Sequence, residues 1–267
     1  MSNKNESIGK VVLVAVLLSI FFSVVVSSAA VLLKPVQIKN KNLDMKTNIL
    51  AAAGMLEQGA GADQIEETFK QFDVRLVDLD SGEYVDPKTL GLKEAMAYDQ
   101  YKAASKPNTS YDLSAAQDIA DIKRRANVAK VYIYKEGGEI KRLVLPIHGY
   151  GLWSTLYGFI ALKGDLNTIA GLGFYQQAET PGLGGEVDNP MWKAKWPGKK
   201  VYGDENMEPK IRLVKGGVDP TKPGTEYKVD ALSGATLTSR GVTNLLQFWM
   251  GDLGFAPYLK NLRQGEV

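Results

Sequence analysis

The chain has 267 residues, no cysteine, one histidine and a formal net charge of 32 − 30 = +2. The absence of cysteine excludes disulfides, thiolate zinc sites, cysteine-ligated iron–sulfur clusters and a cysteine nucleophile. The single histidine, His148, excludes a two-histidine site, so we expect no metal site, and any redox chemistry would need a bound organic cofactor. The near-neutral charge gives no indication of a nucleic-acid partner.

An apolar segment lies close to the N-terminus. Residues 11–33 contain no charged side chain, and Lys10 and Lys34 flank them. About 20 helical residues cross the hydrocarbon core of a bilayer, so we predict a transmembrane helix over 11–33, after a cytoplasmic segment over 1–10. The alternative is a cleaved signal peptide, since the small residues 27–29 form a plausible cleavage site.

The lysines around this segment bear on which side of the membrane the following chain lies. Two precede it and four follow it closely, so the positive-inside rule would place the following chain in the cytoplasm. That rule is weak here, because long domains translocate largely regardless of charge. No second apolar stretch of comparable length follows, so we expect residues 34–267 to form one water-soluble domain.

Helical patterns come first in that domain. Residues 42–57 have helical spacing, and Asp63 is suited to cap a second helix. Residues 74–79 have the composition of a strand. The polar residues 86–125 are expected to form helices and loops.

Strand patterns dominate the middle of the domain. The alternating segments 130–135 and 139–145 surround a Gly-Gly pair, which predicts a hairpin. Further strands are expected over 153–162, 168–175, 211–215 and 227–229. A last helix, capped by Thr238 or Ser239, is expected to end before Gly251. Helices followed by strands favour an α+β fold with a mainly antiparallel sheet.

Several familiar catalytic motifs are missing from the sequence. There is no G-x-G-x-x-G after a strand, no phosphate-binding G-x-x-x-x-G-K-[ST], no H-E-x-x-H and no G-x-S-x-G. A free dinucleotide site or a nucleoside triphosphate site is therefore unsupported.

Residues 230–239, DALSGATLTS, are the most unusual segment. Four hydroxyl side chains surround a Gly-Ala pair directly before the last helix. Small residues let a ligand approach the backbone, and the amides of a helix start favour an anion such as phosphate. The alternative is a helix cap that binds nothing.

Two further segments have features of a cofactor site. Residues 179–185, ETPGLGG, form a restricted loop whose amides could face a flat ring, or a plain turn. Residues 149–158, GYGLWSTLYG, place aromatic side chains beside glycines; these could flank a planar cofactor or belong to the core.

These segments resemble a known family. The residues Asp230-x-x-Ser233-Gly234-Ala235-Thr236 resemble the flavinylation motif D-x-x-[ST]-G-A-T of FMN-binding domains. Residues 149–162, residues 179–185 and the NILAAAG stretch at 48–54 resemble those of the C subunit of the Na⁺-translocating NADH:quinone reductase. The G subunit of the Rnf electron-transport complex is similar over the FMN domain only.

The resemblance implies a covalent flavoprotein. In such proteins FMN is joined to the last threonine of the motif, here Thr236, by a phosphoester, and a dedicated flavin transferase supplies it from FAD. The domain, with its motif core at about 130–250, would lie on the periplasmic side of a bacterial inner membrane. It would relay electrons one at a time within a membrane complex of six subunits that oxidises NADH, reduces ubiquinone and exports Na⁺. NADH would bind another subunit.

The resemblance also indicates candidate cofactor contacts. The motif supplies Asp230, which we expect to orient the turn, together with Ser233, Gly234 and Ala235. The candidates for lining the flavin ring are Trp153, Ser154, Thr155, Glu179, Thr180, Pro181, Gly182 and Leu183. Lys215 is a candidate cation near the phosphate or the ring. The alternatives are the G subunit of an Rnf-type complex or a non-redox exported binding module.

Overall fold

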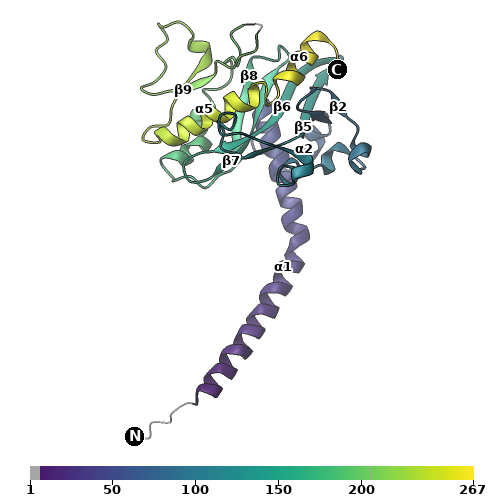
Figure 1. Cartoon of the computed structure of the whole chain (residues 1–267), viewed down its shortest axis with the longest axis vertical. Helices are drawn as coiled ribbons and strands as arrows, with labels where there is room; N and C mark the ends of the chain where they lie inside the picture. Colours follow the sequence, from purple (N-terminus) through teal and green to yellow (C-terminus); the bar gives the residue numbers. More distant parts are fainter. Residues whose placement is uncertain (1–6, 205) are drawn as a thin grey trace. The chain divides into compact units, whose positions relative to one another are not determined.

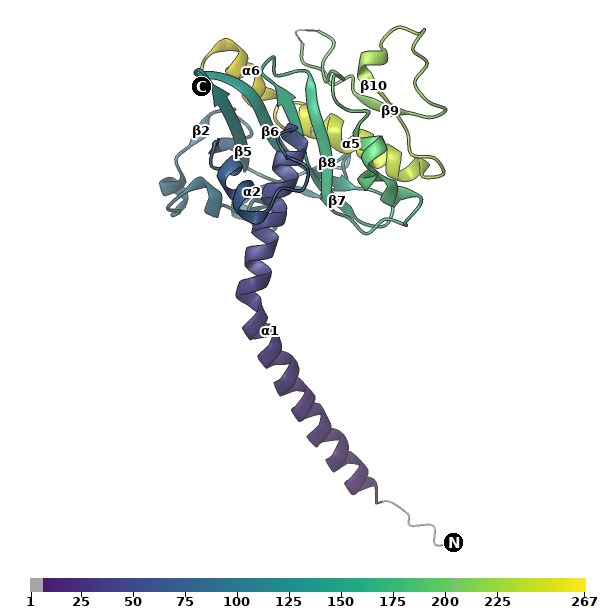
Figure 2. The ribbon, with the colours of Figure 1, turned by 180° about the vertical axis from the view of Figure 1, so that it is seen from behind.

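The computed structural model describes residues 7–204 and 206–267. The chain divides into a unit that ends at Asp44 and a compact unit Met45–Val267. Residues 1–6 of the N-terminal segment expected over 1–10 lie outside the described residues. All the motif segments belong to the second unit, which Figures 1 and 2 show from two sides.

One long helix, α1 (Ile8–Ala53), contains both the apolar segment and most of the helix expected over 42–57. Our expectation of two separate helices is therefore wrong. The intervening residues 34–41 contain no glycine, and Pro35 lies inside the helix, where it removes one backbone donor. Among the described residues, α1 is the one helix that is long and apolar enough to cross a membrane.

A six-stranded antiparallel sheet forms the centre of the second unit, in the order β2-β1-β5-β6-β7-β8. Its strands are β1 (Phe72–Asp78), β2 (Tyr84–Val85), β5 (Val128–Glu136), β6 (Glu139–Tyr150), β7 (Thr155–Lys163) and β8 (Ile169–Gln176). The predicted hairpin is confirmed, since β5 and β6 meet at Gly137 and Gly138, both at positive φ as a tight hairpin turn requires. The α+β class with a mainly antiparallel sheet is likewise confirmed.

Shorter elements complete the unit. β3 (Ser110–Asp112) pairs with β4 (Arg124–Ala126), and β9 (Arg212–Val214) runs parallel to β10 (Lys228–Asp230). The helices are α2 (Ala62–Phe69), α3 (Gln100–Ala104), α4 (Pro190–Lys193), α5 (Thr236–Met250) and α6 (Ala256–Gln264). The 3₁₀ turns are η1 (Pro87–Leu90), η2 (Ala95–Ala97), η3 (Pro107–Thr109), η4 (Gly184–Asp188) and η5 (Thr225–Tyr227). The region 86–125 therefore also contains strands, each too short to leave an alternating pattern.

Helices cover both faces of the sheet. α5 crosses one face, in front of the sheet in Figure 1 and behind it in Figure 2. It packs so closely on β6 that a Cβ at Gly149 would lie 2.5 Å from Leu245 Cβ. The last turn of α1 covers the other face, where Arg142 Nε donates 2.9 Å to the Ala53 carbonyl oxygen. This arrangement places the start of α5 beside the loops that precede β7 and follow β8.

Two helices begin elsewhere than at their expected caps. α2 has Gly61 as its N-cap, and Asp63 lies inside the first turn. α5 begins at Thr236 after Ala235, without a side-chain cap. Thr238 and Ser239 are buried inside its first turns and make tertiary hydrogen bonds instead. The start of α5 is therefore held from outside the helix.

Candidate functional site

A buried carboxylate joins the three motif segments. Glu179 is 5% exposed, and its Oε1 accepts hydrogen bonds from the backbone amides of Leu152, Trp153 and Ser154 at 3.1, 3.0 and 3.0 Å. The Ser154 hydroxyl adds a fourth at 3.2 Å. On the other side, Thr238 Oγ1 donates a hydrogen bond of 2.7 Å to Glu179 Oε2. The loop before β7, the loop after β8 and the first turn of α5 thus share one anion.

This carboxylate is ionised at neutral pH. Burial raises the pKa of Glu179, but the hydrogen bonds from Thr238 and from the amides of residues 152–154 outweigh it, so the pKa lies below its ordinary value. Two glycines enclose the group. A Cβ at Gly151 would lie 2.7 Å from Glu179 Oε1, and one at Gly184 would lie 2.6 Å from Thr238 Oγ1. Side chains at either position would displace the carboxylate or its donor.

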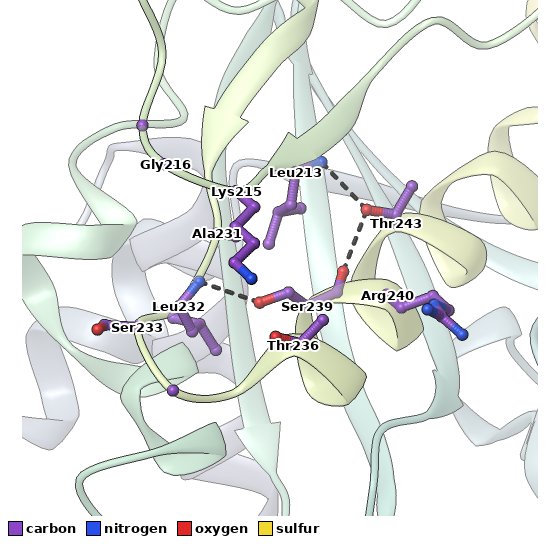
Figure 3. Close-up of a pocket in the computed structure, with 12 residues that line it drawn as sticks. Leu213, Lys215, Gly216, Ala231, Leu232, Ser233, Thr236, Ser239, Arg240 and Thr243 are labelled. Carbon is purple, nitrogen blue, oxygen red and sulfur yellow. Dashed lines mark hydrogen bonds between the residues drawn. The ribbon is translucent and has the colours of Figure 1, made fainter.

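Thr236 is the first residue of α5, and its side chain is exposed. It lies on a pocket of about 610 Å³, within the range of ligand pockets, about 300–1,000 Å³. Figure 3 shows Lys215 and Arg240 on the same pocket. The pocket is lined by Leu213, Lys215, Gly216, Gly217, Ala231, Leu232, Ser233, Gly234, Thr236, Ser239, Arg240 and Thr243.

Most hydroxyl groups around Thr236 are engaged. Ser239 Oγ accepts from the Leu232 amide at 3.0 Å, and Thr243 Oγ1 donates 3.1 Å to the Ser239 carbonyl oxygen (Figure 3). In the described part of the chain, no hydrogen bond forms to the hydroxyls of Ser233 or Thr236, or from the backbone amides of residues 236–238. Unused amides at the start of a 15-residue helix attract an anion.

Asp230, the last residue of β10, supports the pocket from outside its lining. Its Oδ1 accepts a hydrogen bond of 2.7 Å from the Val218 amide, and its Oδ2 forms an ion pair with Lys195 Nζ. The Lys195 ammonium holds the pKa of Asp230 below its ordinary value. The backbone carbonyl oxygen of Asp230 accepts 2.9 Å from Trp192 Nε1. Asp230 therefore ties the loop that carries the pocket-lining residues 216–217 to α4.

Comparison with known proteins identifies the family of this chain. Residues 151–251 match the family model of the FMN-binding domain. The C subunit of the Na⁺-translocating NADH-quinone reductase of Pseudomonas aeruginosa is 49% identical, over 100% of both chains. The chain belongs to the NqrC family, the C subunits of the Na⁺-translocating NADH-quinone reductases. The same subunit of Vibrio anguillarum is 46% identical over 99% of both chains.

Solved structures agree with this NqrC fold. The crystal structure of Shewanella oneidensis NqrC superposes with a TM-score of 0.75 and 36% identity, covering 84% of this chain and 99% of that one. The C subunit from Parabacteroides distasonis gives a TM-score of 0.62 and 27% identity, covering 85% and 96%. Membership over the full length of the curated relatives distinguishes the chain from the alternatives of an Rnf-type subunit or a non-redox module.

In the structure, the predicted cofactor contacts fall into two sets. Lys215, Ser233, Gly234 and Thr236 line the pocket, whereas Ala235 is buried as the N-cap of α5. The second set lies on the two loops that Glu179 joins and at the start of β7: Trp153, Ser154, Thr155, Thr180, Pro181, Gly182 and Leu183. These residues do not line the pocket, but a Cβ at Gly234 would lie 2.9 Å from Leu183 Cδ2, so the two sets meet there.

The residues present fit an FMN group. The exposed, unbonded Thr236 hydroxyl, the unused helix amides and the two cations suit a phosphoester. Trp153 and Leu183, 67% and 43% exposed, supply apolar surface for a planar ring. The sequence-based prediction did not include Arg240. A signal was available, because Arg240 follows Thr236 by four residues and helical periodicity places such residues on one face.

Proposed function

We propose that this chain carries FMN on Thr236 through a phosphoester and relays electrons within a Na⁺-translocating NADH:quinone reductase. One observation carries the proposal. Within residues 230–239, Thr238 and Ser239 use their hydroxyls for hydrogen bonds inside the fold. In the part of the chain that the structure describes, the Thr236 hydroxyl is exposed and unbonded on a pocket with two cations. The match to the FMN-binding domain over 151–251 supports the choice of flavin.

Attachment is a phosphoryl transfer that needs no redox change. The Thr236 hydroxyl oxygen forms a bond to the flavin-side phosphorus of FAD. The bond from that phosphorus to the bridging oxygen of the diphosphate breaks, and AMP leaves. The hydroxyl proton passes to a base of the flavin transferase, since a threonine hydroxyl is a poor nucleophile at its free pKa. The free amides at the start of α5 then face the phosphate in its final position.

The residues of the chain have distinct proposed roles. A bound flavin supplies one-electron chemistry that the side chains alone lack. Lys215 and Arg240 offset the negative charge of the phosphoester from the pocket side. Residues Trp153 to Thr155, before and at the start of β7, and the loop with Thr180 to Leu183 would pack against the ring. Asp230 orients the pocket through Val218 and Lys195.

Membership of the family supports a proposed location and a proposed set of partners. We place the soluble domain on the periplasmic side of a bacterial inner membrane, held by α1 as a retained single-pass anchor. Its partners are the five other members of a complex of six subunits that oxidises NADH, reduces ubiquinone and exports Na⁺, and the flavin transferase during maturation. The apolar segment of α1 supports an anchor, because it has no partner inside the chain among the described residues.

The test is a substitution pair in the motif. The full chain is co-expressed with the flavin transferase, and covalent flavin is detected as a fluorescent band of 29.1 kDa on a denaturing gel. Thr236→Ala is expected to abolish the band, whereas Ser233→Thr, which the motif D-x-x-[ST]-G-A-T permits, is expected to keep it. A fluorescent Thr236→Ala protein would overturn the attachment site. A wild-type protein without covalent flavin would contradict the proposed attachment.

Copurification tests the proposed partners. Purification of the membrane-anchored chain under mild detergent is expected to retain the other NADH:quinone reductase subunits. Recovery of the chain without those subunits would contradict the proposed complex.

A further inference from the structure

The start of α5 is restrained in an unusual way. Ala235 occupies the N-cap and offers no side-chain acceptor, so the first amides of the helix stay unused within the described chain. Side-chain caps would occupy one of these amides. In their place, Thr238 donates its hydroxyl proton outward to Glu179 Oε2 at 2.7 Å. This hydrogen bond holds the start of the helix and leaves its first backbone amides unbonded within the described chain.

We propose that the hydrogen bond from Thr238 to Glu179 positions the Thr236 hydroxyl for flavin attachment, with Glu179 acting as a positioning residue rather than a flavin ligand. The proposal rests on the proposed function, namely FMN attachment at Thr236. Thr238 follows Thr236 by two residues in the first turn of α5, so a shift of one moves the other. The restraint leaves the helix amides free to face the phosphate.

The acceptor capacity of Glu179 supports this role. Oε1 receives three amides and the Ser154 hydroxyl, and Oε2 receives Thr238 and a longer contact of 3.2 Å from the Leu152 amide. A carboxylate has about four lone-pair sites, so these donors from the chain saturate it. Glu179 therefore has no acceptor site left for a flavin and serves to join protein segments.

The surrounding packing makes the restraint rigid. Thr238 is 1% exposed, and neither Gly151 nor Gly184 leaves room for a Cβ beside the carboxylate. The carboxylate therefore cannot move away from Thr238 without moving the loops that carry Trp153 and Leu183. The Glu179 carboxylate thus fixes the position of Thr236 relative to the loops that we expect to cover the flavin ring.

The experiment compares three variants of the full chain in detergent, with purified flavin transferase and FAD. Thr238→Val removes the hydroxyl with little change in volume, and Thr238→Ser retains it. Tyr202→Phe is the matched control, because it removes the buried bond of 2.7 Å from Tyr202 Oη to the Met250 carbonyl oxygen at the other end of α5. The initial rate of covalent flavin attachment is measured for each, together with the melting temperature.

Attachment is expected to slow by about tenfold or more in Thr238→Val, because a small misplacement of a reacting group costs a large factor in rate. Thr238→Ser and Tyr202→Phe are expected to stay within about twofold of wild type. Hydrogen exchange of the amides of residues 239–242, the first hydrogen-bonded amides of α5, is expected to be faster in Thr238→Val only. Should Thr238→Val fail to fold, Thr238→Ala removes the same hydroxyl with a smaller side chain, and the same slowing of attachment is expected.

Two results would overturn the positioning role: a wild-type attachment rate in Thr238→Val, or an equal slowing in Tyr202→Phe at a similar loss of melting temperature. Failure of the proposed function has a different signature. Wild-type chain would then carry no flavin, or peptide mapping would find it on a residue other than Thr236.

Discussion

Trp249 Nε1 donates a hydrogen bond of 2.6 Å to the backbone carbonyl oxygen of His148, and their rings lie 4.9 Å apart between centroids. This contact joins the last turns of α5 to β6 directly before the loop that Glu179 holds. The rings of Tyr101 and Tyr157 complete the surroundings of the imidazole. His148 is 7% exposed, and burial lowers its pKa to about 3. The side chain is therefore a neutral part of the core.

The neutral imidazole predicts a pH dependence of stability. In the unfolded chain His148 regains a pKa of about 6.5, so below that pH the unfolded state binds a proton that the folded state excludes. The free energy of unfolding therefore falls as pH decreases from about 6.5 toward 3, by up to about 1.4 kcal/mol per pH unit. Urea unfolding of wild type and His148→Gln at pH 7, 6 and 5 measures the difference in slope. Tyr157→Phe, as control, should keep the wild-type slope, and parallel curves for wild type and His148→Gln would contradict the prediction.

Lys215 and Arg240 are expected to raise the reduction potential of the attached flavin. A positive charge near the ring or phosphate stabilises the reduced, more negative form. Lys215→Gln and Arg240→Gln should each lower the potential by roughly 10–40 mV at low salt, and less at high salt, because exposed charges are screened. Spectroelectrochemical titration at two salt concentrations measures the shift. Lys70→Gln, directly after α2, should leave the potential unchanged, and unchanged values for both pocket variants would argue against their role.

Gly184→Ala is expected to be destabilising and to reduce flavin attachment. The new Cβ would lie 2.6 Å from Thr238 Oγ1 and 2.7 Å from Glu179 Oε2, so the hydrogen bond between them must distort. Overpacking of this kind costs about 1–3 kcal/mol. Gly173→Ala is the control, since its Cβ would meet nothing nearer than Lys193 Nζ at 3.9 Å. Equal unfolding free energies for the two variants would show that the site relaxes freely.

The orientation of the domain is predicted to be periplasmic. A protease added to spheroplasts should then digest the domain while cytoplasmic marker proteins stay intact. The lysines that follow the apolar segment favour the opposite side, so the result distinguishes the family expectation from the positive-inside rule. Protection of the domain until the membrane is permeabilised would favour the charge rule.

The apolar segment of α1 is predicted to remain on the mature chain as an anchor. Intact mass measurement of the membrane-extracted protein should find an N-terminus at Met1 or Ser2. A mature chain starting near Ala30 would instead identify a cleaved signal peptide.

Local patterns predicted much of the fold. The hairpin at Gly137 and Gly138 followed from residue types that favour positive φ, and its two strands, β5 and β6, followed from alternation. The short strand β2 was not predicted. The helix starts were less predictable. Asp63 and Thr238 have the side chains of N-caps, yet both lie inside their helices, because tertiary contacts decided where each helix begins.

By itself, the sequence determined the central hairpin, most of the longer strands, the apolar span and the motif around Thr236, because periodicity, charge and small-residue spacing act over a few neighbouring residues. It did not determine which of the clustered hydroxyls is free. Only the tertiary structure decided that, by bringing Glu179 to Thr238 across 59 positions of the chain and Leu232 to Ser239. The tertiary structure also decided that Glu179 accepts its hydrogen bonds from donors of the protein itself. Hydrogen bonds between distant segments depend on the packing of the whole sheet, which no local pattern encodes.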